Sequence, residues 1–158
     1  MNQSQSSHCI GVISDTHGQL RESVLEIFQG VDQIIHAGDI GNQDIIYDLL
    51  EIAPVFSVRG NMDYYQWAQT LSHDEIVNVG TSRFYVLHDL SMITFDPAES
   101  NFLAVIFGHT HHPTFYQKNG VYYINPGSAG PIRSNKPPPS IARLNVISSS
   151  IEVEWFQI

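Results

Sequence analysis

Polar side chains able to bind a metal follow one apolar run after another in this sequence. The runs are short and rich in β-branched residues, as in Cys9–Ser14, which leads directly into Asp15-Thr16-His17. In open α/β sheets, ligands bind beyond the carboxyl ends of the strands, so these clusters are predicted to meet at one rim. Seven of their side chains can act as metal ligands: Asp15, His17, Asp39, Asn61, His88, His109 and His111.

These seven side chains offer carboxylate, imidazole and amide oxygen, with no thiolate among them. Such a set suits borderline-to-hard divalent ions, so manganese is the first expectation, with iron, zinc or nickel as alternatives. There are more groups than one tetrahedral ion needs, and a central aspartate can bridge through its two oxygens. Two ions roughly 3.5 to 4 Å apart are therefore expected, an arrangement that polarises a phosphoryl group and generates a hydroxide near neutral pH.

The elements that carry the first clusters alternate between two periods. Cys9–Ser14, Gln33–Ala37 and Pro54–Val58 are short runs typical of buried strands, whereas apolar residues recur at helical spacing in 20–28 and 45–52. This alternation predicts a βαβαβ unit with a parallel sheet and right-handed crossovers.

The second half of the chain reads as strands separated by short turns. The Asn119-Gly120 pair is typical of a hairpin turn, which favours a second, more antiparallel sheet. The predicted fold is α/β, a two-sheet α-β-β-α sandwich with mixed sheets. Pro131–Ser140 is expected to be an extended loop. The predicted strands are 75–79, 83–87, 103–107, 114–117, 121–124, 141–146 and 151–156.

Length and charge limit the possible classes of protein. The chain has 158 residues with 7 basic and 16 acidic side chains, a formal net charge of −9. We expect one domain over residues 8–158 and a disordered leader over residues 1–7, which lacks the basic start and apolar run of a secretory signal. The basic residues form no stripe, so binding to duplex nucleic acid or to a membrane surface is not expected.

Cysteine content and hydropathy point to a location inside the cell. The single cysteine, Cys9, excludes an internal disulfide and a cysteine-rich zinc module. The longest apolar stretch, Phe102–Phe107, is far shorter than the roughly 18 residues needed to span a bilayer. We therefore expect a cytoplasmic protein. The apolar tail Val153–Ile158 is either an edge strand or a contact surface between copies of the chain.

The clusters also resemble a known family when taken in order. The motifs are Asp15-x-His17, Gly38-Asp39, Gly60-Asn61-Met62-Asp63, His88, Gly108-His109-Thr110-His111 and Asn125-Pro126-Gly127-Ser128. Over residues 10 to about 145 they resemble the calcineurin-like metallophosphoesterase superfamily, in particular its small bacterial and archaeal phosphodiesterase branch. The sequence is also similar to the small subunit of retromer, a relative that serves mainly as a protein-binding scaffold.

The resemblance implies a role for each of the seven positions. Asp15, His17 and His111 would hold one metal, Asn61, His88 and His109 the other, and Asp39 would bridge the two. Of these, Asp39, Asn61, His88 and His109 would take part directly in catalysis.

Two positions depart from the pattern of the family. Many members have a histidine directly after the Gly-Asn pair, where it protonates the leaving oxygen, but this chain has Met62. Since a general acid typically contributes roughly 10² to 10⁴ in rate, a slow enzyme or an activated leaving group is expected. Asp63 is a poor substitute unless burial raises its pKa. Asp89 stands where the branch often has Gly, and is either an acceptor that orients a ligand imidazole or a solvated loop carboxylate.

Substrate contacts are predicted from two loops. Arg133 follows the Asn-Pro-Gly-Ser turn and is either a phosphoryl contact or an exposed loop arginine. Tyr64, with Tyr65 and Trp67, offers flat rings that either stack on a nucleobase or aryl group or pack as a lid or subunit contact.

The sequence therefore predicts a metal-dependent phosphoesterase acting on a small phosphodiester rather than a monoester, with a hydroxide activated by two metals as the nucleophile. The alternative is a non-catalytic, metal-binding scaffold for protein partners. A sugar- or nucleotide-binding module that uses the aromatic cluster is a third and weaker hypothesis.

Overall fold

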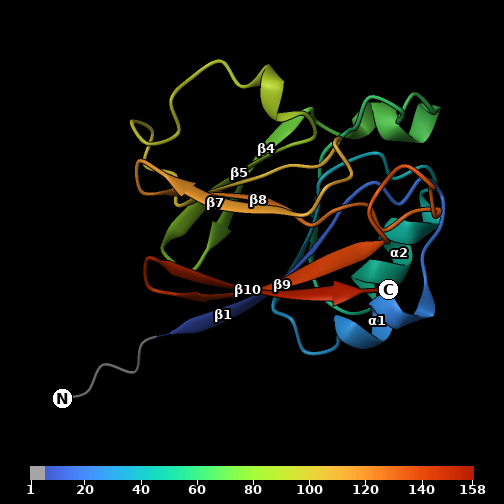
Figure 1. Ribbon diagram of the computed structural model, residues 1–158, viewed down its shortest axis with the longest axis horizontal. Coiled ribbons are helices and arrows are strands. Elements are labelled where there is room, and N and C mark those ends of the chain that lie inside the picture. Colours follow the sequence, from blue (N-terminus) through green and yellow to red (C-terminus); the bar gives the residue numbers. More distant parts are fainter. Residues whose placement is uncertain (1–5) are drawn as a thin grey trace.

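The apolar runs predicted as strands form two five-stranded sheets that stack face to face (Figure 1). The structure is a computed structural model, and it describes residues 6–158. The first sheet has the order β10-β9-β1-β2-β3 and the second β4-β5-β6-β8-β7. The strands are β1 (Ser7–Ile13), β2 (Gln33–His36), β3 (Val55–Ser57), β4 (Asp74–Val79), β5 (Ser82–Leu87), β6 (Ala104–Ile106), β7 (Thr114–Lys118), β8 (Val121–Asn125), β9 (Ser140–Ile147) and β10 (Ser150–Gln157).

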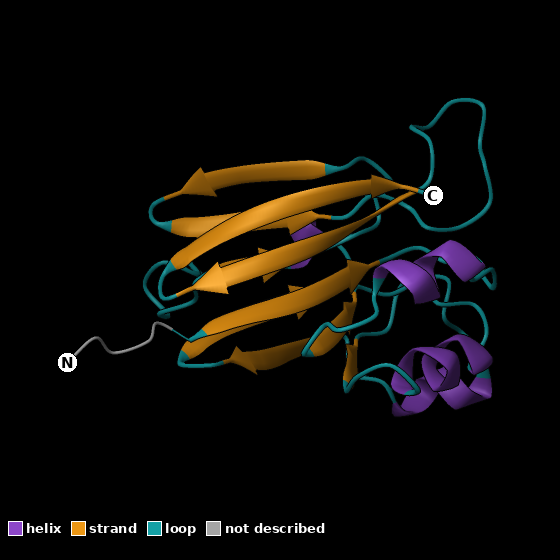
Figure 2. Ribbon diagram, turned by 90° about the horizontal axis from the view of Figure 1, so that it is seen from below, coloured by secondary structure: helices purple, strands orange, loops and turns teal. Residues whose placement is uncertain are grey.

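The predicted βαβαβ unit is present in the first sheet. Strands β1, β2 and β3 pair in parallel, and helices α1 (Glu22–Ile27) and α2 (Asp44–Leu50) form the crossovers between them. Phe28 and Leu49, at the ends of the two helices, are fully buried and pack in one cluster with Ile34 of β2. Figure 2 shows both helices gathered at one end of the strands.

The pairing of the last two strands corrects one expectation. The second sheet was predicted to be the more antiparallel one, but each sheet has two parallel and two antiparallel pairings. Strands β9 and β10 join the first sheet, where β9 lies antiparallel to β1 with Ile10 opposite Leu144. Burial explains this placement, since β9 covers the edge of β1 and buries both Ile141 and Leu144 completely.

The outer face of the second sheet is covered by a loop segment. Leu90 and Ile93 pack against Val105 and Phe107 of the sheet, and the segment contains only a short 3-10 helix, η2 (Leu90–Met92). The two-sheet sandwich is confirmed. On the second sheet, this loop segment takes the place of the outer helical layer that the α-β-β-α prediction contained. A second 3-10 helix, η1 (Gln66–Thr70), follows the loop after β3. The Asn119-Gly120 hairpin is confirmed, with φ angles of 50° and 80°.

The core between the sheets fixes the strands relative to one another. Val12 and Ile35 of the first sheet and Phe84 and Ile106 of the second are fully buried in one cluster. Strand β1 starts at Ser7, inside the segment expected as a leader, and residues 1–5 of that expectation lie outside those that the structure describes. Within residues 6–158, no helix is long and apolar enough to cross a membrane.

Candidate metal centre

Five of the seven predicted ligands form two groups of converging side chains. One group contains Asp15, His17 and His111, and the other contains Asp15, Asp39 and His88, with one ligand atom from each residue within 4.8 Å of the others. These residues follow β1, β2, β5 and β6, so the expected meeting of polar clusters beyond the strand ends occurs.

Asp15 is fully buried and divides its two carboxylate oxygens between two tasks. Its Oδ2 accepts hydrogen bonds from the Ser14 hydroxyl at 2.6 Å and from the His109 backbone N–H at 3.1 Å. Its Oδ1 is buried without a hydrogen-bond partner and lies 3.1 Å from Nε2 of His111, and 3.8 and 3.9 Å from Nε2 of His17 and His88. This oxygen is therefore available to a cation.

His88 presents a nitrogen lone pair to the same space. Its Nδ1–H donates to the carbonyl oxygen of Ala37 at 2.7 Å, so Nε2 is unprotonated in the neutral imidazole. Nε2 is buried, has no hydrogen-bond partner, and lies 3.3 Å from Asp39 Oδ2. Oxygen and nitrogen lone pairs that face one another in a buried site need a positive charge between them. The carboxylate and imidazole ligands present here fit a divalent metal ion.

Asp39 belongs to the second group and also faces His17 of the first. Its Oδ1 accepts a hydrogen bond from the Met62 backbone N–H at 2.8 Å, while Oδ2 is 3.3 Å from Nε2 of His88 and 3.9 Å from Nε2 of His17. The carboxylate shared by both groups is that of Asp15, whereas the family resemblance implies Asp39 as the bridge. The bridging role of Asp39 stays a prediction.

The other two predicted ligands, Asn61 and His109, contact each other at the rim. His109 Nδ1 and Asn61 Oδ1 are 3.1 Å apart, and the His109 side chain is 42% exposed. His109 Nε2 lies 3.7 Å from Asp89 Oδ2. The other oxygen of Asp89 accepts hydrogen bonds from the backbone and the hydroxyl of Ser91. Asp89 thus caps η2 and also faces an imidazole.

The pKa shifts favour ionised carboxylates and one neutral imidazole. Burial alone would raise the pKa values of Asp15 and Asp39, but His111 beside Asp15 and His88 beside Asp39 outweigh it, so both pKa values fall. Burial lowers the pKa of His17 despite the nearby Asp39. For His88, burial is outweighed by Asp39 and Asp15, which raise its pKa. The site therefore holds two negative charges that attract cations.

The loops that carry the ligands are strained and tightly packed. Five of the predicted ligands have left-handed backbone conformations, which L residues rarely adopt outside sites where surrounding structure holds them. They are Asp15, His17, Asp39, His109 and His111, with φ between 46° and 70°. Such strain is common where side chains must converge.

Gly108 permits the close approach of two of these loops, and its replacement by alanine is expected to damage the site. A Cβ at this position would lie 2.0 Å from Oγ of Ser14 and 2.7 Å from Oδ2 of Asp15. We expect Gly108→Ala to weaken divalent metal binding at least about tenfold, as for changes that misorient metal ligands. Calorimetric titration measures this. Gly30→Ala adds backbone strain, since its φ is 81°, but its Cβ would contact nothing within 4 Å, so it is the control for strain without a clash at the ligands. Equal metal affinity in both variants would contradict the expectation.

Several supporting residues were not predicted as such from the sequence. Asn125 Nδ2 donates to the Gly108 carbonyl at 2.8 Å and to Thr110 Oγ1 at 3.1 Å, and the Ser128 hydroxyl donates to the Asp15 carbonyl at 3.0 Å. The Asn-Pro-Gly-Ser motif, which carried part of the resemblance, was the signal that could have identified them. The motif therefore holds the ligand loops in place.

Two residues near the site are structural. Asp63 accepts hydrogen bonds from three backbone N–H groups, those of Ile40, Gly41 and Gly60, so its carboxylate holds the ligand loops together. His36 is fully buried, which lowers its pKa to about 3, and it is therefore neutral. Its Nε2 lies 3.0 Å from the Thr16 hydroxyl, so this histidine packs beside the site.

The predicted substrate contacts lie on exposed loops. Arg133 is exposed, and its positive charge is one of the smaller causes that lower the pKa of His17. Tyr64 is 65% exposed and stacks on Tyr65 with 5.0 Å between ring centroids. Substrate contact by Arg133 or Tyr64 stays a prediction.

Fold and site together define an α/β protein with a buried aspartate–histidine cluster suited to divalent metals. The family model described as the calcineurin-like phosphoesterase superfamily domain matches residues 9–149, and the chain belongs to this superfamily. It is 31% identical over 157 residues to a probable metallophosphoesterase of Methanothermobacter thermautotrophicus, with 92% of this chain and 90% of that protein covered. It is 28% identical over 136 residues to a phosphodiesterase of Methanocaldococcus jannaschii, covering 75% and 82%.

Solved structures show the same fold at lower identity. A structure described as a novel archaeal phosphodiesterase superimposes with a TM-score of 0.78 at 24% identity, covering 94% of this chain and 99% of that one. Vacuolar protein sorting 29 from Cryptosporidium parvum has a TM-score of 0.75 at 17% identity, covering 96% and 98%. At these identities the likeness concerns the fold alone.

Proposed function

We propose that this protein is a metal-dependent phosphodiesterase that uses two divalent ions. The observation that carries the proposal is the convergence of Asp15 Oδ1 and His88 Nε2, two buried acceptors without hydrogen-bond partners, beside the carboxylate of Asp39. Membership of the phosphoesterase superfamily and the likeness to a relative named as a phosphodiesterase support the same conclusion.

Each ion has a proposed set of ligands. Asp15, His17 and His111 would hold one, Asn61, His88 and His109 would hold the other after a small movement of the exposed His109 side chain, and Asp39 would contact both. When bound, such a pair polarises a phosphoryl group and lowers the pKa of a water molecule that attacks phosphorus. The carbonyl of Ala37 holds the His88 ring in the orientation that this set requires.

No side-chain acid stands at the position after Asn61. Met62 is 46% exposed there, and its backbone N–H donates a hydrogen bond to Asp39. The Asp63 carboxylate accepts hydrogen bonds from three backbone N–H groups. The leaving oxygen must therefore depart without a proton from these two side chains. Loss of a general acid costs roughly 10² to 10⁴ in rate, so esters of acidic alcohols such as phenols should react best.

The proposal is tested by hydrolysis of an aryl phosphodiester and the matching aryl monoester. Protein stripped with a chelator should be inactive, and added Mn²⁺ should restore activity. Diester cleavage should then be at least about tenfold faster than monoester cleavage, a difference of about 1.4 kcal/mol in activation free energy. A preference for the monoester would limit the conclusion to a phosphatase. Absence of turnover with any divalent ion would contradict the proposal.

The alternative is a metal-binding scaffold for protein partners, and the absence of an acid at Met62 favours it. Against it, all seven ligand positions hold competent side chains, and a scaffold has no chemical need for the full set. A scaffold would bind metal without hydrolysing phosphate esters. Manganese as the native metal, a cytoplasmic location and contacts between copies of the chain stay predictions.

A further inference from the structure

A cleft of about 470 Å³ adjoins the metal centre. Asn61 and His88 of the site line it, together with residues outside the proposed ligand set, among them Arg59, His73 and Met92 of η2. Ligand pockets commonly measure about 300 to 1,000 Å³, so the cleft has room for a ring-sized group attached to a phosphate at the metals.

Part of the cleft lining is apolar. Leu87 is buried and Met92 is 71% exposed, so a ligand in the cleft that contacts Met92 would cover a methionine side chain that solvent now reaches. The ring of Tyr85 is held edge-on against Phe95 at 4.9 Å between centroids. Flat or aliphatic groups therefore find a preformed surface here, and burial of their apolar area favours binding.

One permanently positive side chain, that of Arg59, lines the cleft. The Arg59 guanidinium has five N–H donors, and its contacts are with Gln69 Oε1 at 2.7 Å and with Nε2 of His73. Every ion pair within residues 6–158 joins a histidine to an aspartate near the metal centre, so Arg59 has no carboxylate partner there. Three donors thus stay available to an anion.

Two carboxylates, those of Asp74 and Asp89, also line the cleft, and each accepts a hydrogen bond from a neighbouring side chain. Asp74 Oδ2 accepts a hydrogen bond of 2.6 Å from the Tyr85 hydroxyl, and Asp89 accepts two from Ser91 while facing His109. Neither forms an ion pair with the guanidinium of Arg59 within 4 Å. Arg59 is therefore the one arginine or lysine among the described residues that line the cleft, and its positive charge is not paired with either carboxylate.

We infer that this cleft binds one organic group of the phosphodiester, a ring-sized apolar group that carries an anionic oxygen group, and that Arg59 determines this specificity. The inference rests on the proposed function, because the metals must hold the phosphate. Charge-assisted hydrogen bonds between a guanidinium and a carboxylate are strong and are often bidentate, which suits the free donors of Arg59.

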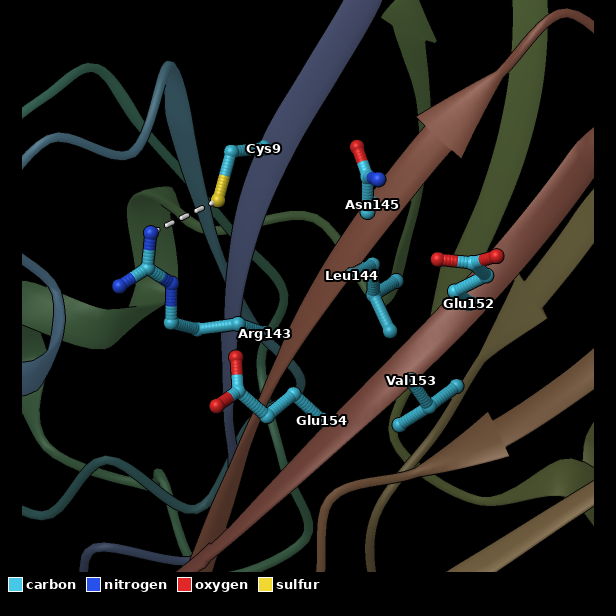
Figure 3. A pocket seen from close by; sticks show the side chains of 7 residues that line it. All are labelled: Cys9, Arg143, Leu144, Asn145, Glu152, Val153 and Glu154. Carbon is cyan, nitrogen blue, oxygen red and sulfur yellow. Dashed lines mark hydrogen bonds between the residues drawn. The ribbon is translucent and has the colours of Figure 1, made fainter.

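A second arginine provides a matched control. Arg143 lines a separate pocket of about 360 Å³ on the first sheet and donates a hydrogen bond to the sulfur of Cys9 at 3.2 Å. Figure 3 shows this pair with the other side chains that line the pocket. Arg143 also donates to the Ile27 carbonyl, and Glu152 and Glu154 line the same pocket. Because Cys9 stands six positions before Asp15 on an extended strand, about 20 Å along it, Arg143 is remote from the metal centre.

The kinetic test compares bis(4-carboxyphenyl) phosphate with its uncharged analogue, bis(4-carbamoylphenyl) phosphate. The two esters are symmetric, so either ring can occupy the cleft. We expect wild-type protein with Mn²⁺ to prefer the carboxylate by about tenfold or more in kcat/KM, and Arg59→Leu to bring this ratio close to one. Arg59→Lys should retain part of the preference, and Arg143→Leu should retain all of it. An unchanged ratio in Arg59→Leu would overturn the inference while leaving the phosphodiesterase proposal intact.

A binding test needs no turnover and separates the two proposals. In metal-free protein labelled with ¹³C at the methionine methyl groups, 4-hydroxybenzoate should shift the signal of Met92, and 4-hydroxybenzamide should do so only at concentrations about tenfold higher. The difference should vanish in Arg59→Leu. If no ester were hydrolysed but 4-hydroxybenzoate still bound more tightly than 4-hydroxybenzamide, the proposed function would be wrong while the inferred specificity of the cleft would be supported. Equal shifts with both compounds would refute the anion specificity of the cleft.

Discussion

Replacement of Asp39 by asparagine is expected to remove phosphodiesterase activity and divalent metal binding together. Asp39 Oδ2 lies within 4 Å of Nε2 of both His17 and His88, so one change removes a negative charge from both halves of the site. Changes to groups that merely orient metal ligands already cost about 10- to 100-fold in affinity, so loss of a ligand should cost more than about a hundredfold.

Asparagine is chosen because the fold needs one oxygen of this side chain. Asp39 Oδ1 accepts the Met62 backbone N–H at 2.8 Å, and an asparagine carbonyl can do the same. Asp48→Asn, on the exposed side of α2, removes the same charge away from the site and should leave metal binding unchanged. Calorimetric titration with Mn²⁺ and the aryl diester assay give both readouts. Full activity in Asp39→Asn would exclude it as a shared ligand.

Acidification is expected to release the metals. Ligand imidazoles must be unprotonated, so metal affinity is present above their pKa values and is lost as the pH falls through them. Burial lowers the pKa of His88, but Asp39 and Asp15 raise it by more, so its pKa lies above the ordinary value. In the metal-free protein a proton therefore competes for Nε2 of His88 already above about pH 6.5, the ordinary histidine value. The pKa of His17 is lowered chiefly by burial, so its proton competes only under more acidic conditions.

The expected effect is at least a hundredfold loss of Mn²⁺ affinity between about pH 7.5 and about pH 5.5, since each competing proton costs up to tenfold per pH unit. Thermal unfolding measures it. At a metal concentration of about 100 times Kd, Mn²⁺ should stabilise the protein by about 2.7 kcal/mol. For a domain of this size that raises Tm by roughly 5 to 10 °C. The same shift at both pH values would show that the imidazoles are not ligands.

The fold could be predicted to a large extent because local signals decide most of it. Runs such as Ile10–Ile13 are apolar and β-branched and end in polar residues, and the rule that ligands gather beyond strand ends brought Asp15, Asp39 and His88 together. The partner of β9 could not be predicted, because an apolar strand of this kind pairs equally well with either sheet until tertiary packing decides.

The types of the site residues could be predicted, but their internal arrangement could not. Which oxygen of Asp15 stays free depends on hydrogen bonds from Ser14 and from the His109 backbone, which no sequence pattern encodes. The cleft was missed for a similar reason. Arg59, Tyr85 and Met92 come from three separate segments, and none belongs to a motif.

The central claim is that two ions held by this cluster make the protein a phosphodiesterase. The most direct test is to titrate metal-free protein with Mn²⁺ and to measure bound ions per chain and aryl diester hydrolysis in the same samples. Activity should rise as the second ion binds and reach its maximum at about two ions per chain, as for two-metal sites in general. Full turnover in samples with no bound ion, or two bound ions without any turnover, would contradict the claim.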